Sequence, residues 1–145
     1  MIKTVLVTGA AKRLGRAIAL DLAAHGWNVA IHYNGSEDDA DSAAQAVRAF
    51  GGEAAMLKCD LSKEAETAGL VDRAVEELGP LTALINSASL FENDDWQTAT
   101  RKTWDEHIEI NLRAPLLLSQ LFGKQLPQGD GGCSRTRGNL SVSKQ

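Results

Sequence analysis

Cysteine and histidine are scarce in this 145-residue chain. The two cysteines, Cys59 and Cys133, lie far apart and match no metal-ligand or redox spacing. We therefore expect reduced thiols, a cytoplasmic protein and no metal centre. The histidines also lack a ligand spacing, and we assign a catalytic role to none of the three, which are His25, His32 and His107.

Long apolar runs and an excess of one charge are also absent. No run approaches the ~20 apolar residues that a membrane-spanning helix needs. The apolar start at residues 5–7 is broken by Gly9 and followed by Lys12, which indicates a buried strand and a turn rather than a secretion signal. The formal net charge of -4 argues against nucleic acid as a main partner. With 43% apolar residues, the chain can form one domain with a core, and we expect no membrane partner. The expectation of a small-molecule substrate rests on the motifs described below.

Short apolar segments alternate with helical patterns along the chain. Strands are predicted at four places, which are residues 2–7, 28–33, 53–58 and 81–86. Helices are predicted between them and after the last, over residues 13–25, 37–50, 63–78 and about 103–122, with Ser36, Ser62 and Thr103 as capping residues. The last helix could also begin one turn earlier. This alternation predicts an α/β fold with a Rossmann-like, doubly wound parallel sheet of strand order 3-2-1-4, which binds ligands at the carboxyl ends of its strands.

The first strand is joined to the first helix by the segment Thr8-Gly9-Ala10-Ala11-Lys12-Arg13-Leu14-Gly15. A strand, a glycine turn and a helix in this order are typical of a dinucleotide site. Glycine lets the backbone approach a pyrophosphate, and the N–H groups of the helix N-terminus face its negative charge. Lys12 and Arg13 are unfavourable cations at a helix N-terminus, unless a bound phosphate lies beside them.

The end of the second strand distinguishes the two nicotinamide cofactors. An NAD site uses an Asp or Glu there to bind the ribose hydroxyls. Here the segment is Tyr33-Asn34-Gly35-Ser36, with no acidic residue before Glu37. Lys12, Arg13 and Ser36 could instead receive a 2′-phosphate, so the sequence favours NADP(H) over NAD(H).

The composition changes at about Gln125. Proline and glycine are followed by a polar segment, residues 133–145, in which Leu140 and Val142 are the only large apolar residues. Such a segment cannot supply a buried strand. We therefore expect residues 1–126 to form the dinucleotide-binding region and residues 127–145 to form an irregular, disordered or aberrant tail.

The glycine turn resembles the Thr-Gly-x-x-x-Gly-x-Gly turn of the short-chain dehydrogenases/reductases, with Arg13 in place of the middle glycine. Asp60 follows the third strand where that family contacts the adenine ring, although a plain turn or helix-capping role is the alternative. Asn86-Ser87-Ala88-Ser89 resembles the family's Asn-Asn-Ala-Gly, although the amide of Asn86 could also tie adjacent strands together. Asn111 matches the asparagine of the catalytic tetrad, which holds a proton-relaying water. Over residues 4–122 the resemblance implies a cofactor site made of Gly9, Lys12, Arg13, Leu14, Gly15, Tyr33, Asn34, Ser36, Asp60, Leu61, Asn86, Ser87 and Ala88.

A narrower resemblance is to pteridine-reductase-like members of this family. They share the Lys-Arg-Leu-Gly form of the turn, the stretch from His32 to Ser36, and the pattern Asn-x-Ala-Ser-x-Phe that ends at Phe91. The resemblance implies that Ser89 and Phe91 line a pterin site, and that the chemistry is hydride transfer from a reduced nicotinamide to a ring C=N bond. For Phe91, local packing is the alternative.

The family's proton donor is the tyrosine of a Tyr-x-x-x-Lys motif after a fifth strand, preceded by Ser or Asp. This chain has a single tyrosine, Tyr33, and Glu37 lies four residues later. We therefore expect the sheet to be truncated before its fifth strand and the chain by itself to lack catalysis. We hypothesise a frameshift near Gly132, though an aberrant splice or another truncation would give the same pattern. The fourth strand would then be an unpaired edge, which predicts poor solubility or self-association.

Three functions follow from these residues and resemblances. The first is an NADPH-dependent short-chain reductase of the pteridine type, acting on dihydropterin or dihydrofolate, whose full-length form is a homo-oligomer. The second is a non-catalytic, truncated NADP-binding module. The third is a short-chain reductase for ketone or hydroxyl substrates, such as oxoacyl groups or sugars.

Overall fold

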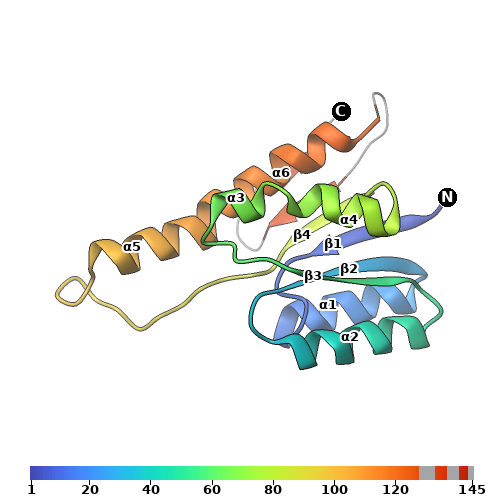
Figure 1. The fold of residues 1–145 in the computed structure, drawn as a ribbon, viewed down its shortest axis with the longest axis horizontal. Helices are drawn as coiled ribbons and strands as arrows, with labels where there is room; N and C mark the ends of the chain where they lie inside the picture. The colour runs from blue at the N-terminus through green and yellow to red at the C-terminus, as the bar shows by residue number, and fades with distance from the viewer. Residues whose placement is uncertain (128–132, 137–140, 144–145) are drawn as a thin grey trace.

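The structure is a computed structural model that describes residues 1–127, 133–136 and 141–143, the last two segments by their backbone (Figure 1). Its described part contains one sheet of order β3-β2-β1-β4-β5-β6. The first four strands are parallel and comprise β1 (Lys3–Val7), β2 (Trp27–Tyr33), β3 (Ala54–Lys58) and β4 (Ala83–Asn86). The predicted α/β fold and the strand order 3-2-1-4 are therefore confirmed.

Helices cover both faces of this sheet (Figure 1). On one face, Val5 and Val7 of β1 pack in a core with α1 (Arg13–Ala24) and α2 (Glu37–Ala49). On the other face, Leu6 packs in a second core with α4 (Leu70–Leu78) and α6 (Ala114–Gln125). Successive side chains of a strand point to opposite faces, so a strand covered on both sides carries a run of apolar residues, as β1 does at Val5, Leu6 and Val7.

The helix predicted over residues 63–78 is divided in two. A short helix α3 (Glu64–Thr67) precedes α4, and Gly69 between them donates its N–H to the Glu66 carbonyl at 3.2 Å, in a tight turn. Glycine is a poor helix former, which explains the interruption. The predicted capping residue Ser62 does not cap α3: its N–H and hydroxyl both donate to Asp60, and the helix N-cap is Lys63.

The long helix near residues 103–122 also consists of three parts, which are α5 (Arg101–Ile108), a π-helical segment η1 (Glu109–Arg113) and α6. It begins one turn before Thr103, because Thr100 and Thr103 form a reciprocal capping box. Ser36 is the N-cap of α2 as predicted, although its side chain makes no capping hydrogen bond. Along this helix Leu112 and Leu116 are exposed, whereas Phe122 is buried. No helix among the described residues is long and apolar enough to cross a membrane.

Two further strands correct the prediction for the C-terminal segment. The strand β5 (Cys133–Thr136) pairs in parallel with β4, and β6 (Ser141–Ser143) pairs antiparallel with β5. The expectations that no fifth strand follows, that β4 is an unpaired edge and that residues 127–145 lack regular structure are wrong for these segments. A ladder joins backbone N–H and C=O groups, so the exposed row along β4 can pair with a segment of polar composition. Residues 128–132, 137–140 and 144–145 of the predicted tail lie outside the described residues.

Candidate functional site

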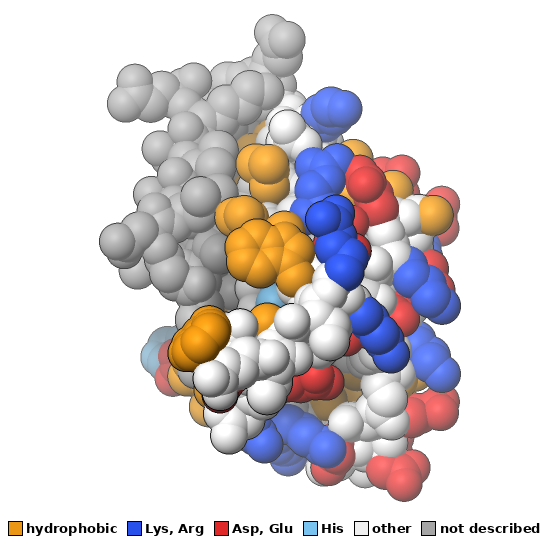
Figure 2. Space-filling model, turned by 90° about the vertical axis from the view of Figure 1, so that its left-hand side faces the viewer, with side chains coloured by type: hydrophobic (Ala, Val, Ile, Leu, Met, Phe, Trp, Pro, Cys, Tyr) orange, Lys and Arg blue, Asp and Glu red, His pale blue; other side chains and the backbone are white. Residues whose placement is uncertain are grey.

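A cleft of about 370 Å³ lies beyond the carboxyl ends of the central strands. Its walls come from four segments: the turn between β1 and α1, the end of β2, the residues after β3, and the residues after β4. This is the end of an open parallel sheet at which ligands bind, beside the strand where the order reverses. The face of the molecule seen in Figure 2 carries Lys and Arg side chains next to exposed hydrophobic side chains.

The glycine turn fits closely against its neighbours. Gly9 has a φ of +64°, and a Cβ at this residue would lie 2.9 Å from the Cα of Ala88. A Cβ at Gly15 would lie 2.1 Å from the carbonyl oxygen of Gly9. Both distances are too short for a side chain. The two glycines therefore let the turn, the start of α1 and the residues after β4 pack together, and leave backbone at the wall of the cleft.

Arg13 adopts the left-handed conformation in which the resemblance expects glycine. Its φ is 51°, and among the described residues other than glycine it alone has a positive φ. The left-handed region costs an L-residue roughly 1–2 kcal/mol, so the arginine is accommodated in a turn whose shape is set by its surroundings. Arg13 lines the cleft, as does Lys12, whose Nζ is 3.3 Å from the Asp39 carboxylate. Both cations are exposed.

Thr8 ties the first strand to the residues after β4. Its buried hydroxyl oxygen accepts the backbone N–H groups of Ser87 and Ala88, each at 3.0 Å. Ser87, Ala88 and Ser89 all line the cleft. Asn86 precedes these three residues but does not line the cleft, and only 2% of its surface is exposed.

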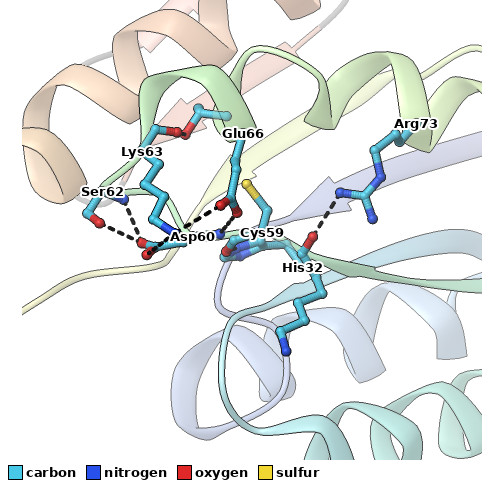
Figure 3. Close-up of polar contacts among 9 residues, drawn as sticks. His32, Cys59, Asp60, Ser62, Lys63, Glu66 and Arg73 are labelled. Atoms are coloured by element: carbon cyan, nitrogen blue, oxygen red, sulfur yellow. Dashed lines mark hydrogen bonds and ion pairs between the residues drawn. The ribbon is translucent and has the colours of Figure 1, made fainter.

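His32 joins the turn to the third strand. Its Nδ1 accepts the N–H of Gly9 at 2.9 Å, and its Nε2 lies 2.9 Å from the carbonyl oxygen of Cys59. Because a backbone N–H can only donate and a carbonyl can only accept, the imidazole is neutral with its proton on Nε2. Burial lowers the pKa of His32, and the positive charge of Arg73 lowers this pKa further. Figure 3 shows Arg73, Cys59 and His32 in this neighbourhood.

Asp60 lies in the cleft wall and also organises the turn after β3 (Figure 3). Its carboxylate accepts the N–H and the hydroxyl of Ser62 at 3.0 and 2.7 Å. These hydrogen bonds, that of the hydroxyl above all, lower the pKa of Asp60. The turn role that the sequence left open is therefore present, and the adenine contact stays a prediction. Cys59 lines the same wall, and burial raises the pKa of its thiol to about 11, so it is protonated near neutral pH.

Asn111 lies in the π-helical segment η1, outside the cleft lining. Its Oδ1 accepts the N–H of Leu90 and its Nδ2 donates to the Leu90 carbonyl, both at 2.8 Å. The amide thus anchors the loop after β4, and π-helical turns of this kind are frequent at functional sites. The water-holding role implied by the resemblance stays a prediction. Phe91, one residue further along the same loop, is 86% exposed and does not line the cleft.

Most of the site residues named from the sequence meet at this cleft. Those that line it are Gly9, Lys12, Arg13, Leu14, Gly15, Tyr33, Asn34, Ser36, Asp60, Leu61, Ser87, Ala88 and Ser89. Those that do not are Asn86, Phe91 and Asn111. Sequence reasoning named no role for six lining residues, which are Ala11, His32, Gly35, Cys59, Leu90 and Ile110. Of these, His32 carried a signal, because it begins the stretch shared with pteridine-reductase-like proteins. Among the described residues, no group of three or more His, Cys, Asp or Glu could hold a metal ion.

Comparison with known proteins identifies the family. Residues 3–133 match the family described as short chain dehydrogenase. The chain belongs to the short-chain dehydrogenase family. The match ends one residue beyond Gly132, where the sequence composition has already changed. The resemblance noted from the glycine turn, the fourth strand and Asn111 is therefore confirmed.

Three proteins that are similar to this chain illustrate the likeness. One is FolM alternative dihydrofolate reductase 1 from Brucella suis, whose crystal structure is in complex with NADP. It is 38% identical to this chain and superposes on it with a TM-score of 0.87, and the match covers 92% of this chain and 56% of the FolM chain. An oxidoreductase of Methylorubrum extorquens is 35% identical over 90% of this chain and 52% of its own length. The 3-oxoacyl-(acyl-carrier-protein) reductase FabG of Staphylococcus epidermidis is 34% identical over 78% of this chain and 46% of its own length. The chain thus spans about half the length of the relatives that it matches.

Proposed function

We propose that this chain is the NADP(H)-binding part of a short-chain oxidoreductase whose substrate class is most like that of a pteridine reductase. The observation that carries the proposal is the charge of the cleft wall. Lys12 and Arg13 stand at the start of α1, and the end of β2 contributes no acidic residue. Asp60 is the acidic residue in the described lining, and its carboxylate already accepts hydrogen bonds from Ser62.

The backbone of the glycine turn fits a pyrophosphate. A Cβ at Gly9 or Gly15 would collide with neighbouring backbone, so the turn keeps its shape only with glycine at both residues. The N–H groups of Gly9 and Ala10 are bonded to His32, so those that a phosphate would meet belong to the first turn of α1. The N-terminus of α1 adds the partial positive charge of a helix end. Residues 1–126 would thus form the nucleotide-binding region.

Lys12 and Arg13 fit the 2′-phosphate that distinguishes NADP(H) from NAD(H). Neither cation is favourable at a helix N-terminus, and a dianionic phosphate would offset that cost. Lys12 is held by Asp39 at 3.3 Å in an exposed ion pair, which a phosphate can exchange because exposed pairs are weak. Ser36 at the end of β2 offers a hydroxyl on the same wall.

The substrate class rests on the residues after β4 and on the similar proteins. Ser89 lines the cleft, and Phe91 is exposed on the adjoining loop, where an aromatic ring could stack on a pterin. The 38% identity to an alternative dihydrofolate reductase supports the pteridine type. The 34% identity to an oxoacyl reductase supports the alternative, a ketone or hydroxyl substrate.

The chain binds the cofactor without turnover in this proposal. A bound NADPH would supply the hydride, but the sequence holds no Tyr-x-x-x-Lys to donate the proton. Asn111, the one matching tetrad residue, has its amide bonded to Leu90. A non-catalytic NADP-binding module is thus the second candidate. The full-length form is proposed to be a homo-oligomer. Its proposed place is the cytoplasm, which is in keeping with the free, buried thiol of Cys59.

Calorimetric titration of the 145-residue chain with NADPH and with NADH at moderate salt tests the proposal. We expect NADPH to bind at least about tenfold more tightly, a difference of about 1.4 kcal/mol. Equal affinity for NADH would overturn the assignment of Lys12 and Arg13. A parallel assay with NADPH and either dihydrobiopterin or a ketone is expected to show no oxidation of NADPH, and turnover of either compound would overturn the non-catalytic reading.

A further inference from the structure

We infer that His32 is a positioning residue of the nucleotide site: its neutral imidazole holds the N–H of Gly9 and thereby sets the shape of the glycine turn. The inference rests on the proposed function, because the turn matters only if it receives a nucleotide. His32 was assigned no role from the sequence. The structure makes it the side chain through which β2 contacts both the turn and the residues after β3.

Two consecutive N–H groups of the turn donate hydrogen bonds to His32. Gly9 donates to the imidazole Nδ1 at 2.9 Å, and Ala10 donates to the backbone carbonyl of His32 at 3.0 Å. Gly9 is the residue with a φ of +64° whose missing side chain lets the turn approach Ala88. A residue in this conformation is held by its surroundings, and the imidazole is the side chain that supplies this anchor.

The opposite edge of the ring is fixed as well. Nε2 donates to the carbonyl of Cys59 at 2.9 Å, and the N–H of Cys59 donates to the carbonyl of Tyr33 at 3.0 Å. The imidazole therefore lies between two cleft-lining segments and cannot rotate without breaking both hydrogen bonds. It is 3% exposed, so neither bond can be replaced by water at low cost.

Neither asparagine nor glutamine reproduces both contacts, and this offers a matched pair of variants. In His32→Asn, the amide oxygen can take the place of Nδ1 and accept from Gly9, while the contact with Cys59 is lost. In His32→Gln, the longer amide can donate to Cys59 in place of Nε2, while Gly9 loses its acceptor. Each variant removes one buried hydrogen bond, so each should destabilise the fold to a similar degree. Only His32→Gln should release the turn.

The experiment measures NADP⁺ affinity by calorimetry and the hydrogen exchange of the Gly9 amide by NMR in the 145-residue chain and both variants. We expect His32→Asn to bind within about threefold of the unmodified chain and His32→Gln to bind at least about tenfold more weakly. The Gly9 amide should exchange faster in His32→Gln alone. Equal affinity of the two variants, or unchanged protection of Gly9 in His32→Gln, would overturn the inference and leave His32 as a core residue only.

The unmodified chain provides a test that does not depend on the folding of a variant. Imidazole ¹⁵N shifts of His32 should report a neutral ring with its proton on Nε2, and a proton on Nδ1 would contradict the inference. Failure of the proposed function has a different signature, because the unmodified chain would then bind neither NADP⁺ nor NADPH. The exchange of Gly9 would still decide whether His32 fixes the turn.

Discussion

The two sides of the cleft are held in different ways. The nucleotide side comprises the β1–α1 turn and the ends of β2 and β3, and its buried side chains form hydrogen bonds with backbone groups. Thr8 binds the residues after β4, and His32 binds Gly9 and Cys59. On the loop side, residues 89–113, the aromatic residues Phe91 and Trp96 are 86% and 88% exposed. Figure 1 shows this loop and α5 extending away from the sheet.

This difference indicates that the nucleotide site, unlike the loop side, is already formed in the folded chain. A nucleotide site with buried hydrogen bonds keeps its shape without a ligand, because its polar groups have no alternative partners. The loop side is anchored chiefly through exposed contacts such as that of Asn111 with Leu90. We therefore expect changes that release the buried glycine turn to alter stability and cofactor affinity together. Changes on the loop side should alter neither by much.

The strongest test of this difference is Gly15→Ala. The new Cβ would lie 2.1 Å from the carbonyl oxygen of Gly9, which is backbone and cannot rotate away. We expect a loss of about 3 kcal/mol in the free energy of unfolding, measured in urea, and the loss of measurable NADPH binding. Gly35→Ala is the matched control in the same cleft wall, because no atom lies within 4 Å of its Cβ position. It should change stability by less than about 0.5 kcal/mol. Similar effects of the two substitutions would refute the close fit of the turn.

The next largest effect is expected for Thr8→Val. This change keeps the shape of the side chain but removes the acceptor of the Ser87 and Ala88 N–H groups. Leaving one buried donor without a partner costs about 1–3 kcal/mol. The Ser87 N–H is buried and the Ala88 N–H is only partly buried, so we expect about 2 kcal/mol in urea unfolding. Thr8→Ser retains the hydroxyl and should lose about half as much. If Thr8→Ser is the more damaging change, packing of the methyl group and not the hydroxyl joins the two sides.

A smaller effect is expected from pH through His32. Burial lowers its pKa below the ordinary value of 6.5, so the unfolded chain binds a proton more readily than the folded chain. The contribution of the neutral ring to stability is complete above pH 6.5 and is lost as the pH falls from there through the folded pKa. The slope is at most about 1.4 kcal/mol per pH unit.

Urea unfolding between pH 7.5 and pH 5.5 measures this slope. His32→Asn lacks the titrating ring and should show a flatter profile over the same range. Asp60 is a second group with a shifted pKa, but it is lowered from 3.8 and acts only in more acidic solution. An equal slope in His32→Asn and the unmodified chain would mean that another group is responsible.

The fold was predictable because the same physical pattern repeats along the chain. Short apolar runs such as Val5-Leu6-Val7, bounded by turn residues, are typical of strands covered on both faces, and the glycine turn fixes where the first of them ends. The strand β5 was not predictable, because pairing with β4 depends on backbone groups that every sequence offers. The division of the long helix by the π-helical η1 likewise left no mark in its composition.

The candidate site was predictable at residues whose type is required by the backbone conformation. It was not predictable at residues whose role depends on contacts made only in the folded chain. Gly9 and Gly15 stand out in any sequence, since the turn tolerates no side chain there. His32 begins a stretch shared with pteridine-reductase-like proteins, but its anchoring role was not predictable. That role depends on two backbone groups, at Gly9 and Cys59, that come close only in the folded sheet. Leu90 and Ile110 line the cleft through ordinary apolar side chains and carry no chemical signal.

The smallest effects are expected at the exposed ion pair of Lys12 and Asp39, and they test cofactor choice without disturbing the fold. Lys12→Met should weaken NADPH binding by about fivefold and leave NADH binding within about twofold of the unmodified chain. Asp39→Asn frees Lys12 from its ion pair and should strengthen NADPH binding by about twofold. Both effects are small because exposed ion pairs contribute up to about 1 kcal/mol. Lys102→Met removes the same charge from α5, outside the cleft lining, and should affect neither cofactor. The readout is the ratio of the two dissociation constants by calorimetry. If Lys12→Met weakens NADH as much as NADPH, then Lys12 acts on the pyrophosphate that both cofactors share, and the 2′-phosphate must depend on Arg13 and Ser36.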